Sequence, residues 1–150
     1  MARLRAANAG DREAIVGVFH SARAAALPHL PVLHSGAEDY DFFDGHIAAG
    51  ATTVAADGGR VLGFIVVGDA RVEHLYVEPG AQRTGVGSLL LCRAQVLHPG
   101  GLDLWAFQRN SGAIAFYEAH GFTIAETGDG SGNEEREPDA RMVWPAPLSS

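Results

Sequence analysis

The 150-residue sequence contains no lysine, so its eleven basic residues are all arginines. A P-loop needs a lysine next to its serine or threonine, and its absence excludes that class of nucleotide site. Eighteen acidic residues outnumber the arginines and give a net charge of −7. No clustered basic stripe is present, so we expect no nucleic-acid partner. The acidic balance suits a cationic acceptor such as an amine, but solubility alone would also produce it.

Cysteine occurs once, as Cys92, so no internal disulfide can form. It lies in an apolar run, VGSLLLCRAQVL, and we predict a buried structural thiol rather than a nucleophile. Long apolar runs are also lacking, since no segment approaches the roughly 18 residues that a membrane helix needs. No secretory-type stretch follows the basic N-terminal residues. We expect a cytoplasmic protein without a membrane partner, formed as one domain over residues 1–150.

Helical spacing of apolar residues appears in four segments. Asp11, Ser35 and Asn110 are predicted to cap three of them, and Ser35 with Glu38 has the spacing of a capping box. Gly121 stands where a left-handed C-terminal cap belongs. The third helix is predicted to bury one face, formed by Val86, Leu89, Leu90, Ala94 and Leu97. The four predicted helices cover residues 11–26, 35–47, 85–97 and 110–120.

Short β-branched or apolar runs predict the strands, and Asp57-Gly58-Gly59 is typical of a hairpin turn between two of them. The prolines of residues 27–34 and the polar, glycine-rich residues 127–139 predict loops. Helices precede a meander, and helix–strand alternation follows. This order predicts an α+β fold with a mixed sheet and helices on both faces. The predicted strands cover residues 3–7, 52–56, 61–67, 72–77, 102–107, 122–125 and 142–144.

Two glycines at the start of the third predicted helix suggest an anion site. Gly85 and Gly87 remove side chains that would keep an anion from the free N–H groups of the first turn, and Arg83 adds positive charge. A dinucleotide fingerprint is excluded, because Leu90 stands where its third glycine belongs and the preceding loop is too long for its tight turn. For the glycine pair alone, an ordinary helix-capping loop remains the alternative.

The longer segment LYVEPGAQRTGVGSLLL resembles the acetyl-CoA-binding motif of the GNAT N-acetyltransferase superfamily, in which a Gln/Arg-x-x-Gly-x-Gly/Ala loop holds the pyrophosphate. The strand before the loop is similar to the fourth strand of that fold. A second segment, LWAFQRNSGAIAFYEAHGF, is similar to the closing motif of the family. The resemblance is strong over residues 72–122 and weak before Thr52. Its matching residues are Leu75, Val77, Pro79, Gln82, Arg83, Gly85, Gly87, Asn110, Tyr117, Gly121 and Phe122.

The resemblance implies a GNAT fold with a mixed, mostly antiparallel sheet of six to seven strands, splayed at its centre, and about four helices on both faces. It also implies acetyl-CoA as cosubstrate and no metal. Main-chain groups near Leu75 and Val77 would meet the acetyl and pantetheine groups, and residues 82–88 would wrap the pyrophosphate. The implied cofactor-binding residues are Leu75, Tyr76, Val77, Gln82, Arg83, Thr84, Gly85, Val86, Gly87, Ser88, Asn110, Phe116 and Tyr117.

Two side chains are candidates for proton transfer. By its place in the second motif, Tyr117 would protonate or hydrogen-bond the departing thiolate, and aromatic packing against the sheet is the alternative. Glu73 is the candidate base, since period-two alternation puts it on the strand face of Leu75 and Val77, toward the splayed opening. An ordinary solvated glutamate is the alternative. His74 falls on the opposite face and is predicted to be a packed or surface histidine.

The predicted function is therefore N-acetylation of a primary amine by direct attack in a ternary complex. A non-catalytic acyl-CoA-binding or regulatory module is the alternative from another class, and a longer acyl donor or a hydroxyl acceptor also stays open. The expected acceptor is a small-molecule amine or a peptide N-terminus, and a homodimer is possible in this family. In the late loop, Asn133, Glu134 and Glu135 could hold a cation, although a solvated surface is favoured. The histidines show no metal-ligand spacing.

Overall fold

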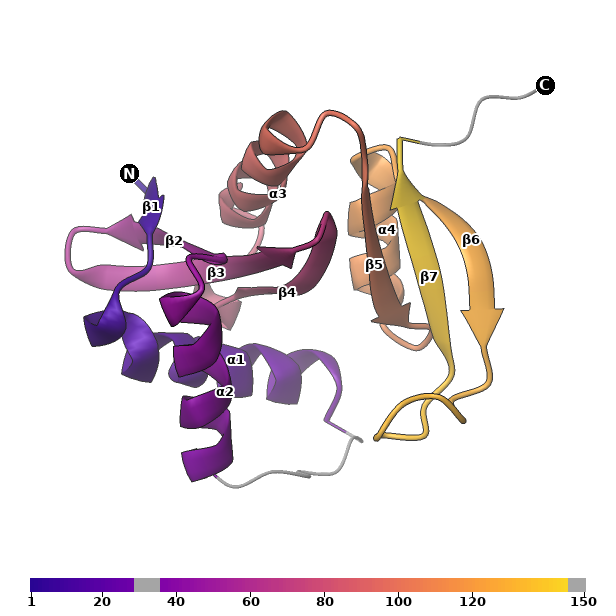
Figure 1. Cartoon of the computed structure of the whole chain (residues 1–150), viewed down its shortest axis with the longest axis horizontal. Helices are drawn as coiled ribbons and strands as arrows, with labels where there is room; N and C mark the ends of the chain where they lie inside the picture. The colour runs from indigo at the N-terminus through magenta and orange to yellow at the C-terminus, as the bar shows by residue number, and fades with distance from the viewer. Residues whose placement is uncertain (29–35, 146–150) are drawn as a thin grey trace.

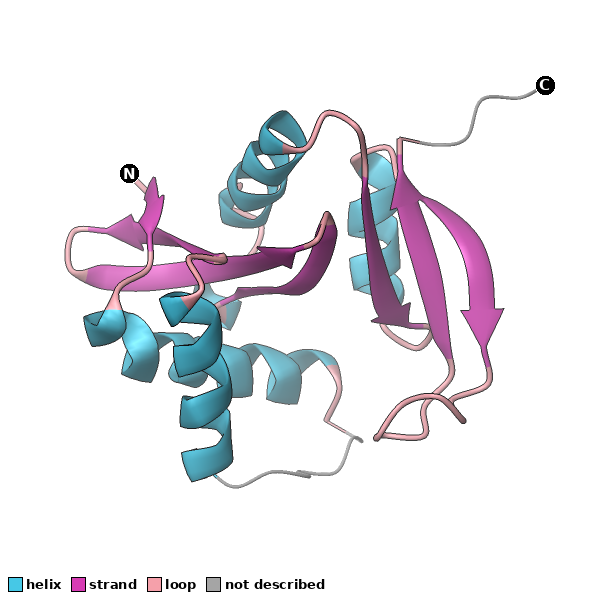
Figure 2. Cartoon of the chain, viewed as in Figure 1, coloured by secondary structure: helices cyan, strands magenta, loops and turns pink. Residues whose placement is uncertain are grey.

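The computed structural model describes residues 1–28 and 36–145, and Figures 1 and 2 show their arrangement. The strands within these ranges are β1 (Arg3–Ala6), β2 (Thr52–Asp57), β3 (Arg60–Gly68), β4 (Arg71–Val77), β5 (Leu102–Phe107), β6 (Thr123–Gly128) and β7 (Asp139–Trp144). The α-helices in the same ranges are α1 (Arg12–Ala26), α2 (Gly36–Ala48), α3 (Val86–Leu97) and α4 (Ser111–Ala119). Short 3-10 turns occur at Ala9–Asp11 and Pro79–Ala81.

The described strands form one seven-stranded sheet in the order β1-β2-β3-β4-β5-β7-β6. Its neighbours are antiparallel except for β4 and β5, which are parallel and pair at two positions, Arg71 with Asp103 and Val72 with Leu104. Beyond these positions the two strands diverge (Figure 1). The predicted α+β fold, with its mixed and centrally splayed sheet, is confirmed.

Two apolar clusters cover opposite faces of the sheet. The first contains Leu90 and Leu91 of α3 and Tyr117 of α4, packed with residues of β3, β4, β5 and β7. The second contains Ile15 of α1 and Phe43 of α2, packed with residues of β2 and β3. Helices therefore lie on both faces, as the order of elements predicted. Figure 1 shows α1 and α2 below the first strands and α3 above them.

The start of α1 differs from the prediction. Asp11 makes no side-chain hydrogen bond to the first turn of α1. Its carboxylate instead accepts hydrogen bonds from Arg5 Nη1 at 2.7 Å, from Arg5 Nη2 at 2.9 Å and from the backbone N–H of Asn8 at 2.8 Å. Asp11 thus joins β1 to the 3-10 turn, which Asn8 caps. The predicted cap at Ser35 lies outside the described residues.

The two glycine turns follow the prediction closely. Asp57 pairs with Arg60 across Gly58 and Gly59, as expected for the predicted hairpin. Gly121 follows α4 with φ of 90°. The late loop is shorter than predicted, because β6 continues to Gly128 and β7 begins at Asp139. The strand ends carry polar and glycine residues, which predict a loop as long as the strand that they pair with is unknown.

The buried face of α3 differs from the prediction. Val86, Leu90, Leu91 and Ala94 are buried, whereas Leu89 is 42% and Leu97 is 61% exposed. Cys92 is exposed as well, so the prediction of a buried thiol is wrong. A continuous apolar run does not show by itself which side of the helix is buried. Here the sheet contacts the side of α3 that carries Leu91 rather than Leu89. Among the described helices, none has the length and apolar character required to cross a membrane.

A first prediction concerns the close contact between β3 and the strand that follows it. A Cβ added to Gly63 would lie 2.9 Å from the backbone oxygen of Tyr76 and 3.2 Å from a methyl group of Val86. We expect Gly63→Ala to lower the free energy of unfolding by about 1–3 kcal/mol, because neither neighbour can move freely. Denaturant unfolding measures this. Gly59→Ala is the matched control, since no atom lies within 4 Å of its added Cβ; equal losses in both variants would contradict the packing argument.

Candidate functional site

The divergence of β4 from β5 leaves backbone groups of β4 without a strand partner. The N–H of Glu78 donates to the carbonyl of Leu62 at 2.8 Å, which directs that residue's amide toward β3. Amides along a strand point alternately to its two edges. The N–H groups of Leu75 and Val77 therefore point to the edge of β4 that faces the opening. These are the main-chain groups that the sequence motif indicated.

The facing edge of β5 is open in the same way. The N–H of Asp103 donates to the carbonyl of Ala70 at 3.0 Å, at the point where the strands still pair. By the same alternation, the N–H groups of Trp105 and Phe107 point into the opening. Two rows of main-chain donors and acceptors thus face each other without forming a ladder. Backbone groups in this state need water or a ligand, and an extended chain between the strands would supply partners to both.

Glu73 stands at the point where the opening begins, one residue beyond the last β4–β5 pair. The β3–β4 register shifts here, because Val66 pairs with His74 and Val67 with Val72, so Glu73 is the extra residue of a bulge. The predicted alternation fails at this bulge. Val72 packs in the same core cluster as Leu75, three positions away, while Glu73 is exposed. The prediction that Glu73 shares the face of Leu75 is wrong, but its place beside the opening stands.

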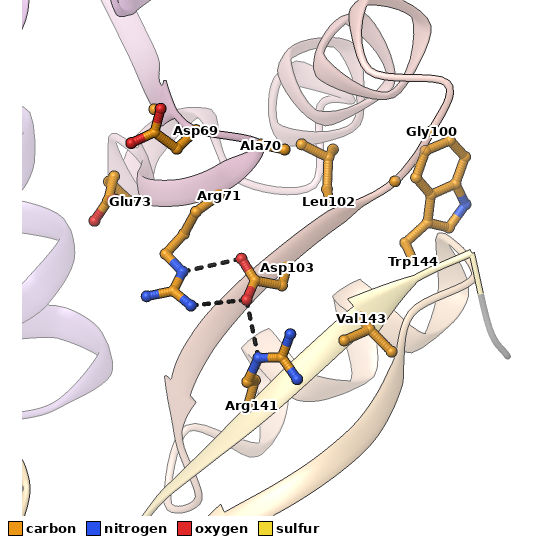
Figure 3. A pocket seen from close by; sticks show the side chains of 12 residues that line it. Asp69, Ala70, Arg71, Glu73, Gly100, Leu102, Asp103, Arg141, Val143 and Trp144 are labelled. Carbon is orange, nitrogen blue, oxygen red and sulfur yellow. Dashed lines mark hydrogen bonds and ion pairs between the residues drawn. The ribbon is translucent and has the colours of Figure 1, made fainter.

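An open pocket of about 530 Å³ lies next to Glu73 (Figure 3). On its wall, Asp103 accepts two hydrogen bonds from Arg71, at 2.9 and 2.8 Å, and one from Arg141 at 2.9 Å. The two hydrogen bonds from Arg71, and then the one from Arg141, hold the pKa of Asp103 below its usual value despite partial burial. This network joins β4, β5 and β7 where β4 and β5 still pair. It therefore fixes the point at which the two strands begin to diverge.

The loop between β4 and α3 has the conformation that an anion site requires. Gly85, the N-cap of α3, has φ of 90° and makes no side-chain cap bond. Arg83 also has positive φ, at 65°, and is exposed. Thr84 Oγ1 donates to the carbonyl of Ala81, and Gln82 Nε2 donates to the carbonyl of Val77 at 3.3 Å. The loop is therefore held by its own polar side chains, and the first N–H groups of α3 stay available.

The first turn of α3 lies against α4. A Cβ on Gly87 would be 3.3 Å from the Phe116 ring, so a glycine allows this close approach. Ser88 Oγ lies 3.0 Å from Nε2 of His120, whose Nδ1 lies 2.8 Å from the carbonyl of Phe116. His120 was missed by the sequence reasoning, and only its position one residue before Gly121 could have indicated a role. It connects the end of α4 to the first turn of α3. Val86 is buried, so only its backbone can take part in binding.

Tyr117 lies on the α3 side of the opening. It is 9% exposed, and its ring contacts Phe116 at 5.4 Å and Phe122 at 5.6 Å between centroids. No described residue forms a hydrogen bond with its hydroxyl group, and among the described residues only Thr52 Oγ1 is a fully enclosed side-chain oxygen without a partner, so the Tyr117 hydroxyl keeps some access to solvent. Burial, and to a lesser extent Tyr76, raises its pKa above the usual value. Both interpretations of Tyr117 therefore have support: its ring packs against other aromatic rings, and its hydroxyl group is available to a ligand. Asn110 caps α4 as predicted, accepting from the N–H of Ala113 at 3.2 Å.

His74 and Tyr76 lie on the other face of β4, against α1 and α2. The His74 ring contacts Phe42 at 5.2 Å and Phe43 at 5.4 Å, and Tyr76 contacts Phe19 at 5.1 Å. His74 is thus a packed histidine, as predicted. Burial, together with His46 and Arg23, lowers its pKa to about 4, so the imidazole is neutral near pH 7. Tyr117 packs in the cluster on the α3 side of the sheet, and Tyr76 packs against the cluster on the opposite side.

Cation binding by the late loop, the alternative to a solvated surface, would require free acidic groups. Not all of its acidic groups are free. Glu135 forms an ion pair with Arg23 of α1 at 3.0 Å. Asn133 donates to the carbonyl of Glu137 at 2.8 Å and to Asp139 Oδ2 at 3.1 Å, which closes the loop on itself. Over residues 1–28 and 36–145, no three His, Cys, Asp or Glu side chains gather as metal ligands would.

Comparison with known proteins agrees with this geometry. The sequence profile described as acetyltransferase (GNAT) domain matches residues 48–124. The peptidyl-lysine N-acetyltransferase YiaC of Escherichia coli (strain K12) is 34% identical over 103 residues, covering 68% of each chain. The PaiA N-acetyltransferase of Thermoplasma acidophilum, solved in complex with coenzyme A, superposes with a TM-score of 0.74 at 16% identity, covering 95% of this chain and 98% of its own. YncA of Salmonella typhimurium, solved with acetyl-CoA, also gives 0.74, at 19% identity and 100% and 97% coverage.

A second prediction follows from His74. The unfolded imidazole binds a proton near pH 6.5 and the folded one only near pH 4. The unfolded state therefore binds more protons between these values, and the free energy of unfolding falls as the pH drops through this window, by at most about 3 kcal/mol. Urea unfolding at pH 7 and pH 4.5 measures the loss. His74→Phe should show a smaller loss than the wild type, and an equal loss in both proteins would rule out His74 as its source.

Proposed function

Since the chain belongs to the GNAT acetyltransferase family, we propose that it transfers the acetyl group of acetyl-CoA to a primary amine by direct attack in a ternary complex. The observation that carries this proposal is the continuity of the opening with the loop before α3. Unpaired main-chain edges of β4 and β5 lead to a helix N-terminus that can bind an anion. A cosubstrate with a long amide-bearing arm and a pyrophosphate has the matching chemistry.

The chain would bind acetyl-CoA mainly through its backbone. The N–H groups of Leu75 and Val77 would bond the arm and the thioester carbonyl, while Gln82 would exchange its present partner, the carbonyl of Val77, for the cosubstrate. The first N–H groups of α3 and the Arg83 guanidinium would hold the pyrophosphate. Bound acetyl-CoA supplies the activated thioester. The amides at β4 would also stabilise the negative charge that develops on the carbonyl oxygen during attack.

Tyr117 would serve as the acid. The amine nitrogen forms a bond to the carbonyl carbon, the C–S bond breaks, and the sulfur leaves as a thiolate that needs a proton or a hydrogen bond. The Tyr117 hydroxyl has no other partner among the described residues, and it belongs to the helix beside the anion loop. The raised pKa keeps the phenol neutral but makes proton release harder, so the Tyr117 hydroxyl would stabilise the departing sulfur chiefly as a hydrogen-bond donor.

Glu73 would accept the proton of the incoming ammonium, directly or through a water. An alkylamine has a pKa near 10 and is mostly protonated at neutral pH, so it must lose a proton before it attacks. The bulge supports this role, because it places a carboxylate at the vertex of the opening and turns it away from the core. Glu73 has no hydrogen-bond partner among the described residues, which leaves both oxygens available for a substrate or a water.

The primary-amine acceptor is supported by the relatives. YiaC is named for acetylation of peptidyl lysine, and a peptide N-terminus or a small amine has the same reacting group. A release assay of coenzyme A from acetyl-CoA tests the proposal, with Nα-acetyl-lysine amide, an alanyl peptide and spermidine as acceptors. Amine-dependent thiol release is expected with at least one of them. Tight acetyl-CoA binding without release from any acceptor would instead favour the non-catalytic module.

A third prediction concerns Tyr117. Tyr117→Phe keeps the packing with Phe116 and Phe122 but removes the hydroxyl, so we expect kcat to fall about 100-fold, as for loss of a general acid. The dissociation constant of acetyl-CoA should stay close to the wild-type value. Steady-state kinetics and calorimetry measure the two quantities. Tyr40→Phe, on α2, is the control and should leave kcat unchanged. Full turnover by Tyr117→Phe would remove the acid role.

A fourth prediction concerns Glu73. Replacing the carboxylate by an amide in Glu73→Gln removes the proton acceptor, so kcat/KM should fall about 100-fold. The dependence of kcat/KM on pH should also differ from that of the wild type. Asp69→Asn changes another carboxylate on the wall of the same pocket and should retain the wild-type profile. If the profile of Glu73→Gln matches that of the wild type, another group takes the proton.

A further inference from the structure

We propose that Glu135 is the recognition site for the acceptor's ammonium group, and that Arg23 occupies this carboxylate until the acceptor arrives. The proposal rests on the acetyl transfer proposed above and deepens it, because it names the acceptor as a cationic primary amine. It assigns recognition to Glu135 and leaves proton transfer to the groups already described.

The pair joins two distant parts of the chain at the open side of the sheet. Arg23 Nη2 lies 3.0 Å from Glu135 Oε1, across 112 positions of the sequence. Figure 1 shows the C-terminal end of α1 directed toward the loop between β6 and β7, on the side where β4 and β5 diverge. The side chains of Arg23 and Glu135 are only 24% and 17% exposed. A partly shielded pair of this kind is screened less by solvent than a fully exposed ion pair.

The pair lies close to the proposed reaction centre. The Arg23 guanidinium is 5.8 Å from the centroid of the Phe19 ring, and that ring is 5.1 Å from the ring of Tyr76. Burial raises the pKa of Tyr76, Arg23 lowers it and Glu135 raises it further, so both charges act on this phenol. Tyr76 in turn raises the pKa of Tyr117. The charges of α1 and the late loop thus act on the phenol of β4, which in turn acts on the phenol of α4.

The loop does not need the ion pair for its shape. Asn133 makes two side-chain hydrogen bonds, to Glu137 and Asp139, and its Oδ1 accepts from the N–H of Glu137 at 3.1 Å. These bonds fix the turn that carries Glu135. The Arg23 contact is a single hydrogen bond rather than a two-point one, and Glu135 Oε2 has no donor among the described residues. A bidentate pair would be harder to displace.

A primary ammonium can make more hydrogen bonds to this carboxylate than the single one that Arg23 makes. It is compact, carries three donors and can bond to both oxygens of Glu135, whereas Arg23 uses one nitrogen and one oxygen. Arg23 already lies over the Phe19 ring, and this contact does not require Glu135. A negatively charged or neutral acceptor would gain nothing from Glu135 and would leave the existing pair in place. The site therefore selects for positive charge at the reacting nitrogen.

Two variants with opposite expected effects test this inference. Glu135→Gln removes the ammonium site, and the KM of the amine should rise about tenfold or more, as expected for loss of a charge-assisted hydrogen bond. Arg23→Gln removes the competing cation, and the KM should fall or stay unchanged. If the pair only joins the two parts of the structure, both variants break the same contact and both raise KM alike. That result would overturn the proposal.

The measurement is steady-state release of coenzyme A with Nα-acetyl-lysine amide, an alanyl peptide and spermidine, and with acetohydrazide as a nucleophile uncharged at neutral pH. The KM of acetohydrazide should respond to neither variant. Glu135→Asp keeps the charge and should restore part of the affinity. An unchanged dissociation constant for acetyl-CoA shows that each variant is folded. No release by the wild type from any amine would refute acetyl transfer itself, whereas release with equal KM changes would refute only the role of Glu135.

Discussion

The separation of β4 from β5 after two paired residues is the constraint on which the site depends. Had the two strands continued to pair, the amides of Leu75 and Val77 would be used in the ladder. The bulge at Glu73 starts the divergence, and Asp103 fixes its vertex by binding Arg71 and Arg141. Helices then pack on both faces of the sheet, with Tyr117 on one side and Phe19 with Tyr76 on the other. The unpaired edges are thereby held at a distance that another chain of atoms can fill.

Features set by a few neighbouring residues could be predicted from the sequence. Gly58-Gly59 makes a two-residue hairpin, Asn110 caps its helix, and Gly121 takes the left-handed conformation, because in each case the side chain or its absence decides the local backbone. The glycine at the start of α3 belongs to this group as well, since Gly85 takes the left-handed conformation at the predicted helix start. The family resemblance extended this local information to the whole sheet. The resemblance could do this because one motif includes β4 and the other includes β5, the two strands that diverge.

Features set by long-range pairing could not be predicted in this way. The alternation that placed Glu73 on the face of Leu75 is valid only for a strand without a bulge, and the bulge depends on the register with β3. The exposure of Cys92 depends on which side of α3 meets the sheet. The contact of Ser88 with His120, and that of Arg23 with Glu135, join residues far apart in the chain. An apolar run or a run of charges contains no information about such partners.

The proposed role of Glu135 gives the absence of lysine a physical explanation. A cation must neutralise Glu135 while no acceptor is bound, because a partly buried carboxylate without a partner is costly. A lysine in that place would be a primary amine beside an acetyl donor, and so a competing acceptor. A guanidinium stays protonated under all ordinary conditions and has no free lone pair with which to attack a thioester. Arg23 can therefore hold the charge of Glu135 without being consumed. The same property distinguishes it from the acceptor that is proposed to displace it.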